Sequence, residues 1–206
     1  NIIAICGDSG SGKSTLTKIL NELFNDSDNL ILETDRYHKW ERHDLNYQKY
    51  THLNPHANYL EKMSEDVYKL KIGDNIYTVD YDHDTGKFTQ IEKIESKTNI
   101  ILCGLHTLYK NTTNKLLNLK IFMDTDRELI KKWKLDRDLK RGYTPEQIIN
   151  NINKRENDYY EYIEIQKKEA DIILHYYLEN DNIKLNIKLK NIYLNKIKKY
   201  IIHLIL

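Results

Sequence analysis

The sequence contains few residues of the kinds that cross-link or interrupt a chain. Among 206 residues there are two cysteines, two prolines and seven glycines. Cys6 and Cys103 both lie in apolar runs, which argues against a disulfide framework and is typical of buried thiols in a reducing compartment. No apolar run reaches the roughly 18 residues of a membrane-spanning helix, and no secretory leader is recognisable. We therefore expect a cytoplasmic protein without a membrane partner.

The chain also lacks an excess of charge of either sign. Its 32 Lys and Arg residues nearly balance 31 Asp and Glu residues, which gives a formal net charge of +1. A chain without a basic field has no general attraction for nucleic acid, so we expect no nucleic-acid partner. Its length suffices for one domain with a substantial core. Because Asn1 already lies in a strand-like run, we expect a piece of a longer chain.

Short apolar runs alternate with stretches of helical periodicity along most of the chain. These patterns predict buried strands over residues 1–6, 30–34, 100–103 and 119–125, and helices over residues 13–24, 54–70 and 126–141. Thr144, Pro145 and Gln147 open a further helix as cap, first-turn proline and capping-box partner. A hairpin is expected over residues 77–89, with its turn near Asp84. This order predicts an α/β domain with a parallel sheet flanked by helices.

The C-terminal part follows a different pattern. Apolar residues alternate with lysine and asparagine from Ile183 to Leu189, which predicts a strand with one face in water. Residues 192–206 fit a helix or a strand equally well. We divide the chain into a domain over residues 1–178 and a C-terminal extension over residues 179–206. The apolar side of this extension would be exposed on a monomer, so we expect a homodimer or docking against further domains of a longer chain.

Residues 7–14, GDSGSGKS, match the phosphate-binding pattern G-x-x-x-x-G-K-[ST] at every fixed position. The match follows an expected strand and precedes an expected helix, which is the context that this loop requires. Its backbone N–H groups surround phosphate oxygens, Lys13 reaches the outer phosphates, and the Ser14 hydroxyl binds Mg²⁺. We therefore predict a bound nucleoside triphosphate with Mg²⁺. The predicted nucleotide-binding residues of the loop are Gly7, Asp8, Ser9, Gly10, Ser11, Gly12, Lys13, Ser14 and Thr15.

Charged side chains after the second expected strand indicate an acceptor site. Asp35 comes at the carboxyl end of that strand, where ligands of open α/β sheets collect, and its carboxylate can accept a hydroxyl proton. His38 and Arg42 follow at spacings that can present positive donors to an anionic acceptor.

Three cations share one face of the helix expected over residues 126–141. Lys134, Arg137 and Arg141 are spaced i, i+3 and i+7. Such a face can neutralise the charge that spreads over a transferring phosphoryl group. A solvated basic stripe has the same pattern, and the phosphate-binding loop favours the first interpretation.

Several stretches together resemble the phosphoribulokinase and uridine kinase family of P-loop kinases, from Ile2 to about Leu174. They are GDSGSGKST (7–15), DRYHKWER (35–42), THLNPHANYLEKM (51–63), YDHDTG (81–86), GLHTLY (104–109), KLDRDLKRG (134–142) and KRENDYYEYIEIQKKEADIIL (154–174). The aromatic-His pair, the Gly-Leu-His segment and the Tyr-Ile-x-x-Gln-Lys run are nearer to phosphoribulokinases. The resemblance implies a P-loop NTPase-like parallel sheet flanked by helices with a lid helix, to which the C-terminal strand is added.

By this resemblance the chain is an ATP-dependent kinase that phosphorylates a hydroxyl of a small molecule, with a sugar phosphate or polyol phosphate as the expected acceptor. A uridine- or cytidine-type nucleoside kinase and a catalytically weak nucleotide-binding regulatory module are the alternatives. The implied catalytic residues are Lys13, Asp35 and Arg137, and the implied Mg²⁺ ligands are Ser14 and Asp35. The implied acceptor-binding residues are Asp35, His38, Arg42 and His106, and Lys134 and Arg141 bind ATP from the lid.

The strand over residues 100–103 ends in Cys103, where the related kinases carry glutamate. A thiol is a poor ligand for Mg²⁺, which prefers hard oxygen. Ser14 and Asp35 suffice for the metal, or another carboxylate such as Glu33 or Asp124 substitutes, or the domain transfers phosphate poorly; we favour the first explanation. We also expect the buried thiols of Cys6 and Cys103 to lie close together beneath the phosphate site.

Overall fold

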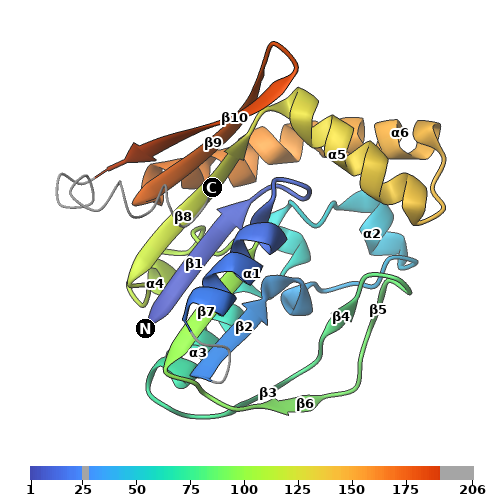
Figure 1. The fold of residues 1–206 in the computed structure, drawn as a ribbon. Coiled ribbons are helices and arrows are strands. Elements are labelled where there is room, and N and C mark those ends of the chain that lie inside the picture. Colours follow the sequence, from blue (N-terminus) through green and yellow to red (C-terminus); the bar gives the residue numbers. More distant parts are fainter. Residues whose placement is uncertain (25–27, 191–206) are drawn as a thin grey trace.

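The computed structural model describes residues 1–24 and 28–190, and within them a six-stranded sheet forms the centre of the molecule (Figure 1). The strand order is β10-β9-β8-β1-β7-β2. All neighbouring pairs are parallel except β9 and β10. The strands are β1 (Ile2–Gly7), β2 (Asn29–Glu33), β7 (Asn99–Gly104), β8 (Leu119–Thr125), β9 (Ile172–Glu179) and β10 (Asn182–Leu189).

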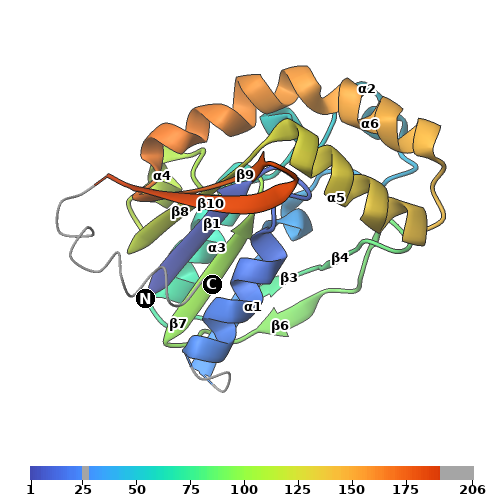
Figure 2. The same ribbon diagram turned by 45° about the horizontal axis from the view of Figure 1, so that its top comes forward.

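Helices cover both faces of this sheet (Figures 1 and 2). The α-helices are α1 (Lys13–Leu23), α2 (Leu45–Lys49), α3 (Leu60–Lys71), α4 (Asn111–Asn114), α5 (Arg127–Lys140) and α6 (Pro145–Asp158). Shorter helical segments span Thr34–Tyr37, Pro55–Ala57, Tyr159–Ile163 and Glu164–Glu169. Leu16 of α1 belongs to the same core cluster as Ile5 and Ile101, whereas Met63 of α3 belongs to a second cluster together with Leu102. The period of two along each strand divides the core into these two layers.

The sequence predicts most of these elements correctly. The predicted strands over residues 1–6, 30–34, 100–103 and 119–125 are confirmed as β1, β2, β7 and β8. The Thr144 capping box is also confirmed, because Thr144 and Gln147 exchange both of its hydrogen bonds. The helix predicted over residues 54–70 begins only at Leu60. The preceding backbone is instead bound by side chains: Asn54 accepts from the His56 N–H, and Asn58 donates to the carbonyls of His52 and Asn54.

The predicted hairpin is confirmed as an arm of two short antiparallel pairs. β3 (Ile76–Thr78) pairs with β6 (Glu92–Ile94), and β4 (Tyr81–Asp82) pairs with β5 (Lys87–Phe88). The turn contains Gly86, whose φ of 71° favours glycine. A Cβ added at Gly86 would lie 2.6 Å from the Arg42 Cβ, and the Arg42 N–H donates to the Gly86 carbonyl at 2.9 Å. This close approach fixes the turn against the loop that follows β2.

The predicted C-terminal strand is confirmed as β10, but the exposed apolar patch expected along it is wrong. β10 pairs with β9 over eight residue pairs, and Ile187 lies opposite Leu174 and is buried. Leu185 and Leu189 pack against the same core cluster, so that Ile183 alone of the four apolar residues is exposed. The apolar face of β10 therefore covers the chain's own core. Residues 192–206 lie outside the described residues, and the homodimer stays a prediction.

The two thiols are buried and free, as expected, but they do not project from the same face. Cys103 is in register with Ile5, whereas Cys6 is in register with Gly104. Since side chains alternate along a strand, a shift of one residue places the two thiols on opposite faces of the sheet. The expectation that they lie together is wrong. In the described parts of the chain, no helix has the length and apolarity needed to cross a membrane.

Candidate active site

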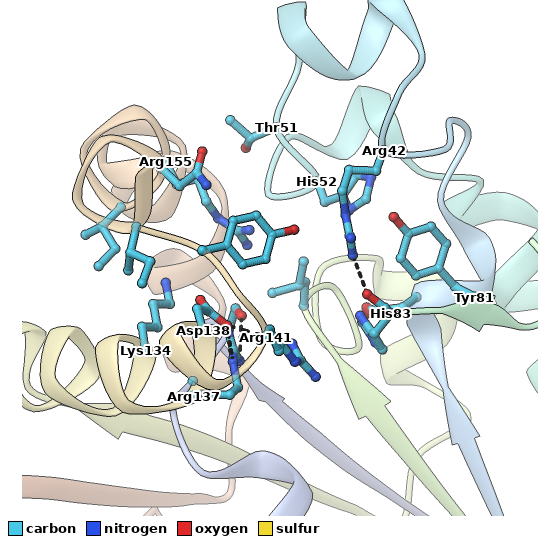
Figure 3. A pocket seen from close by; sticks show the side chains of 18 of the residues that line it. Arg42, Thr51, His52, Tyr81, His83, Lys134, Arg137, Asp138, Arg141 and Arg155 are labelled. Carbon is cyan, nitrogen blue, oxygen red and sulfur yellow. Dashed lines mark hydrogen bonds and ion pairs between the residues drawn. The ribbon is translucent and has the colours of Figure 1, made fainter. Parts of the chain in front are cut away.

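A cleft of about 880 Å³ opens at the carboxyl ends of β1, β2 and β7. Figure 3 shows cations of α5 and α6 on one side and Arg42, His52, Tyr81 and His83 on the other. Ten of the predicted site residues line it: Ser9, Gly10, Lys13, Ser14, Asp35, His38, Arg42, Lys134, Arg137 and Arg141. The predicted residues that do not line it are Gly7, Asp8, Ser11, Gly12, Thr15 and His106.

The phosphate-binding loop connects β1 to α1. Gly12 precedes α1 with φ 94° and offers no side-chain cap, so the first-turn N–H groups remain open toward the cleft. Lys13 Nζ donates to the carbonyls of Gly7 and Asp8, at 3.0 and 2.8 Å. An ammonium has three N–H groups, and this geometry leaves one for another acceptor. The loop therefore combines open backbone donors with a positioned cation.

The Asp8 side chain contacts protein cations rather than the open cleft. Its carboxylate is buried and lies 2.7 Å from Arg127 Nη1, 3.6 Å from Lys134 Nζ and 4.0 Å from Arg155 Nη2. Burial alone would raise the pKa of Asp8, but Lys134, Arg155 and Arg127 outweigh it and lower the pKa to about 2. Asp8 thereby ties the phosphate-binding loop to α5 and α6.

The three cations predicted for a lid all line the cleft from α5 and its end. Lys134 packs against Gly10, where an added Cβ would lie 3.0 Å from Lys134 Cγ. Burial lowers the pKa of Lys134 to about 8. Arg137 forms a two-pronged ion pair with Asp138 at 2.7 and 3.0 Å and lies 3.5 Å from Ser9 Oγ. Arg141 lies 3.8 Å from the same Asp138.

Asp35 lies in the short helical turn Thr34–Tyr37 after β2 and faces two histidines. Its Oδ1 lies 3.5 Å from His38 Nε2, and its Oδ2 lies 3.2 Å from His83 Nε2. Burial alone would raise the pKa of Asp35, but His38, His83 and Lys13 hold it well below its usual range. The hydrogen bond to Asp35 also raises the pKa of His83. The site therefore holds an ionised carboxylate beside a half-exposed histidine.

A pair of stacked, buried histidines lies next to Asp35. The rings of His38 and His52 stack with centroids 3.5 Å apart, and His38 Nδ1 lies 2.7 Å from Asn58 Oδ1. Burial lowers the pKa of His38 and lowers that of His52 to about 2. His106 is buried beneath them, donates from Nε2 to the His52 carbonyl at 3.2 Å, and has its pKa lowered by burial to about 4. His106 is thus a support for His52.

Arg42 reaches the cleft from the loop after β2. Its guanidinium donates to the carbonyls of His83 and Asp84 on the hairpin arm (Figure 3). Among the described residues, no carboxylate forms an ion pair with it. Arg42 therefore offers positive charge to the cleft from the side opposite α5.

Several residues that line the cleft are not among the predicted site residues, and those with polar or charged side chains that face it include His52, Tyr81, His83 and Arg155. Each of these four occurs in a stretch that carries the family resemblance, at residues 51–63, 81–86 or 154–174. Their spacing along the sequence gives no sign that His83 meets Asp35 or that Arg155 meets Asp8. Those contacts depend on how the hairpin arm and α6 pack.

A parallel sheet with a phosphate-binding loop between its first strand and helix, and a cleft across its carboxyl edge, defines a P-loop α/β fold. Residues 2–182 match the family described as "Phosphoribulokinase / Uridine kinase family". The chain belongs to this family.

Relatives with both names are similar to this chain. Phosphoribulokinase of Synechocystis sp. is 36% identical over 174 residues, which cover 84% of this chain and 52% of the relative. Uridine kinase of Anoxybacillus flavithermus is 32% identical over 179 residues, which cover 84% of each. The structure of phosphoribulokinase from Rhodobacter spheroides matches with a TM-score of 0.75 and 22% identity, over 96% of this chain and 84% of that chain. The chain spans about half the length of the phosphoribulokinase of Synechocystis sp..

Proposed function

We propose that this chain carries an ATP-dependent kinase activity and transfers the γ-phosphate to a hydroxyl of a small, phosphorylated acceptor such as a sugar phosphate or polyol phosphate. One observation carries the proposal: Asp35, the phosphate-binding loop and the lid cations line one cleft, whose acceptor side presents Arg42 and His83. We also propose a cytoplasmic location, with which the two free, buried thiols agree.

The nucleotide side of the cleft supplies electrostatic stabilisation. The N–H groups at the start of α1 bind phosphate oxygens, and Lys13 binds the outer phosphates. Lys134, Arg137 and Arg141 approach from α5 and neutralise the charge that accumulates on the transferring group. The transferring group in such reactions is loosely bonded to both oxygens, so positioning and charge contribute most of the catalysis.

Asp35 acts on the acceptor. Its ionised carboxylate receives the hydrogen bond of the attacking hydroxyl and then its proton, as the bond from oxygen to phosphorus forms. Because its pKa is low, Asp35 stays ionised. It can then accept the proton late, when the hydroxyl oxygen has become acidic in the loose transition state. His83 and His38 orient the carboxylate on both sides.

The anion of the acceptor is bound by Arg42 together with His83 on the hairpin arm, whereas His38, whose ring nitrogens face Asn58 and Asp35, acts through Asp35. Arg155, whose Nη2 lies at the outer limit of an ion pair with Asp8, lines the same cleft from α6. Two arginines that converge from separate elements are a common arrangement for binding a phosphate. His106 contributes through the His52 carbonyl.

Mg²⁺ is the expected metal of this chemistry. In the described residues no cluster of three His, Cys, Asp or Glu side chains is placed to hold a metal alone. The cleft instead offers oxygen donors from Ser14 and Asp35, which fits an ion that is bound by one or two carboxylates together with phosphates and water. Once bound, Mg²⁺ supplies charge neutralisation at the β- and γ-phosphates.

A panel of acceptors tests this function. ADP formation is measured with ribulose 5-phosphate and other sugar phosphates, with the same sugars lacking phosphate, and with uridine and cytidine. Turnover that requires the acceptor phosphate supports the proposal, and Arg42→Gln should then raise the KM for the sugar phosphate more than that for ATP. Turnover with uridine or cytidine would support a nucleoside kinase instead, as in the uridine kinase relative. ATP binding without acceptor-dependent turnover would indicate a regulatory module.

A further inference from the structure

The floor of the cleft holds a thiol next to a carboxylate on the neighbouring strand. β2 and β7 are parallel, and Glu33 is in register with Cys103. Partners in register on neighbouring strands project from the same face, about 4.8 Å apart. Both residues line the cleft; the thiol is buried, whereas the Glu33 side chain is exposed.

Tight packing of the two strand ends keeps this register. Thr34 follows Glu33 directly, and Gly104 follows Cys103. A Cβ added at Gly104 would lie 1.7 Å from Thr34 Oγ1, so the close approach requires glycine there. The backbone therefore fixes Glu33 beside Cys103.

In the described residues the Glu33 carboxylate is not held in an ion pair, although its charge helps to raise the pKa of His83. Asp124, the other carboxylate that could replace a missing acid, is bound to Lys167 at 2.8 Å and to His175 at 3.2 Å, and it does not line the cleft. Of the two, Glu33 is the one available to the phosphate site.

We propose that Glu33 supplies the metal-binding carboxylate that the thiol at the end of β7 cannot, and that it holds Mg²⁺ together with Ser14 and Asp35, directly or through water. Mg²⁺ binds hard oxygen ligands and discriminates against thiols. Glu33 is in register with Cys103 on the neighbouring strand and projects from the same face, so its carboxylate can reach the same edge of the site. This inference rests on the proposed nucleotide chemistry and revises the expectation that Ser14 and Asp35 suffice.

The test measures binding of Mn²⁺, a paramagnetic substitute for Mg²⁺, to the protein with a non-hydrolysable ATP analogue, by electron paramagnetic resonance. Glu33→Gln should weaken Mn²⁺ binding by about tenfold or more, a typical loss when one partner of a metal site is removed. Binding of the analogue without metal and the thermal midpoint should stay unchanged. Cys103→Ser and Asp124→Asn serve as controls and should bind Mn²⁺ like the parent protein.

A variant that moves the carboxylate from β2 to β7 tests the inference more sharply than the single substitution. In the double variant Glu33→Gln/Cys103→Glu, the carboxylate moves one strand toward β1, and Mn²⁺ affinity should recover. Parent-like Mn²⁺ binding by Glu33→Gln would overturn the inference, as would a loss seen in Asp124→Asn instead. A failure of the proposed kinase function would appear separately, in the acceptor panel with the parent protein.

Discussion

Lys13 is placed by backbone carbonyls alone, so its side chain can be removed without disturbing the core. Lys13→Ala should abolish ATP turnover while leaving the thermal midpoint nearly unchanged, because the lost contacts are the two carbonyls of the loop and the phosphates. ADP formation and thermal unfolding measure the two effects. Parent-like turnover by this variant would remove the loop from the mechanism.

In the acceptor half of the cleft, catalysis should depend most on the negative charge of Asp35. Asp35→Asn keeps the shape but cannot take a proton, so kcat should fall by about 10²–10⁴-fold, with little change in affinity for ATP. Steady-state kinetics and direct nucleotide binding separate these effects. Loss of ATP binding would instead assign Asp35 mainly to the metal, and unchanged kcat would exclude it as the base.

Asp8 should make stability depend on acidic pH. Its folded-state pKa of about 2 lies below the usual 3.8, so its ion pairs stabilise the fold above pH 3.8 and are lost as the pH falls through about 2. A shift of this size corresponds to about 2 kcal/mol. Asp8→Asn should therefore unfold more easily at pH 7, and the difference from the parent should shrink toward pH 2 in denaturant titrations.

Asp136 provides the control for this prediction. It lies on the same helix as Lys134 and is exposed. Asp136→Asn removes a charge from an exposed side chain and should match the parent in stability at pH 7. A pH-independent effect of Asp8→Asn would show that packing, rather than charge, explains its contribution.

For single residues, the sequence predicts positions that belong to a motif better than contacts that join distant segments. Lys13, Ser14 and Asp35 follow from a fixed pattern beside a strand, and they line the cleft as that pattern requires. The pattern does not reveal that the Asp8 side chain turns away from the cleft, because its partners come from α5 and α6, more than a hundred residues later. The same holds for His83, which reaches Asp35 through the hairpin arm.

Among the elements, β10 tests whether the C-terminal part is an extension or belongs to the core. Ile187 is buried against the cluster around Leu174, so Ile187→Ala should lower the free energy of unfolding by about 2–5 kcal/mol. Ile183 lies on the same face of the same strand but is 50% exposed, and Ile183→Ala should cost clearly less. Equal, small effects in chemical denaturation would favour a separable extension that begins near residue 179.

Helices and strands with a regular spacing of apolar residues are predicted well, whereas those whose existence or bounds depend on tertiary contacts are not. β10 alternates strictly, and its bounds follow from the sequence. β9 was not predicted, because IILHYYLE has no clean alternation and is paired on both sides, with β8 and with β10. α3 starts late because asparagine side chains bind the backbone before it, a competition that hydrophobic spacing cannot detect.

The whole molecule is nearly neutral, but its charge is not evenly spread. The cleft is lined by eight Lys and Arg residues against four Asp and Glu residues. Such a cleft attracts anions over a distance that salt shortens, from about 30 Å at 0.01 M to about 8 Å at 0.15 M. Raising the ionic strength over this range should increase the KM for a sugar phosphate several-fold, and kcat should change less.

A neutral acceptor and a neutral solute are the matched controls. The KM for an unphosphorylated sugar or for uridine should respond less to salt than that for the sugar phosphate. Sucrose at equal osmolality should change neither value much. Equal salt dependence for charged and neutral acceptors would argue against an anion-binding role for the acceptor side of the cleft.

The position of β1 in the sheet has a consequence for how the chain is made. Among the described strands β1 is synthesised before the others, yet it is hydrogen-bonded between β7 and β8, and Ile2 pairs with Ile100. β1 and the loop that follows it therefore stay unpaired until β7 and β8, about a hundred residues later, have been synthesised. During that interval the segment is a natural target for chaperones, and the phosphate-binding loop takes shape only once its late partners arrive.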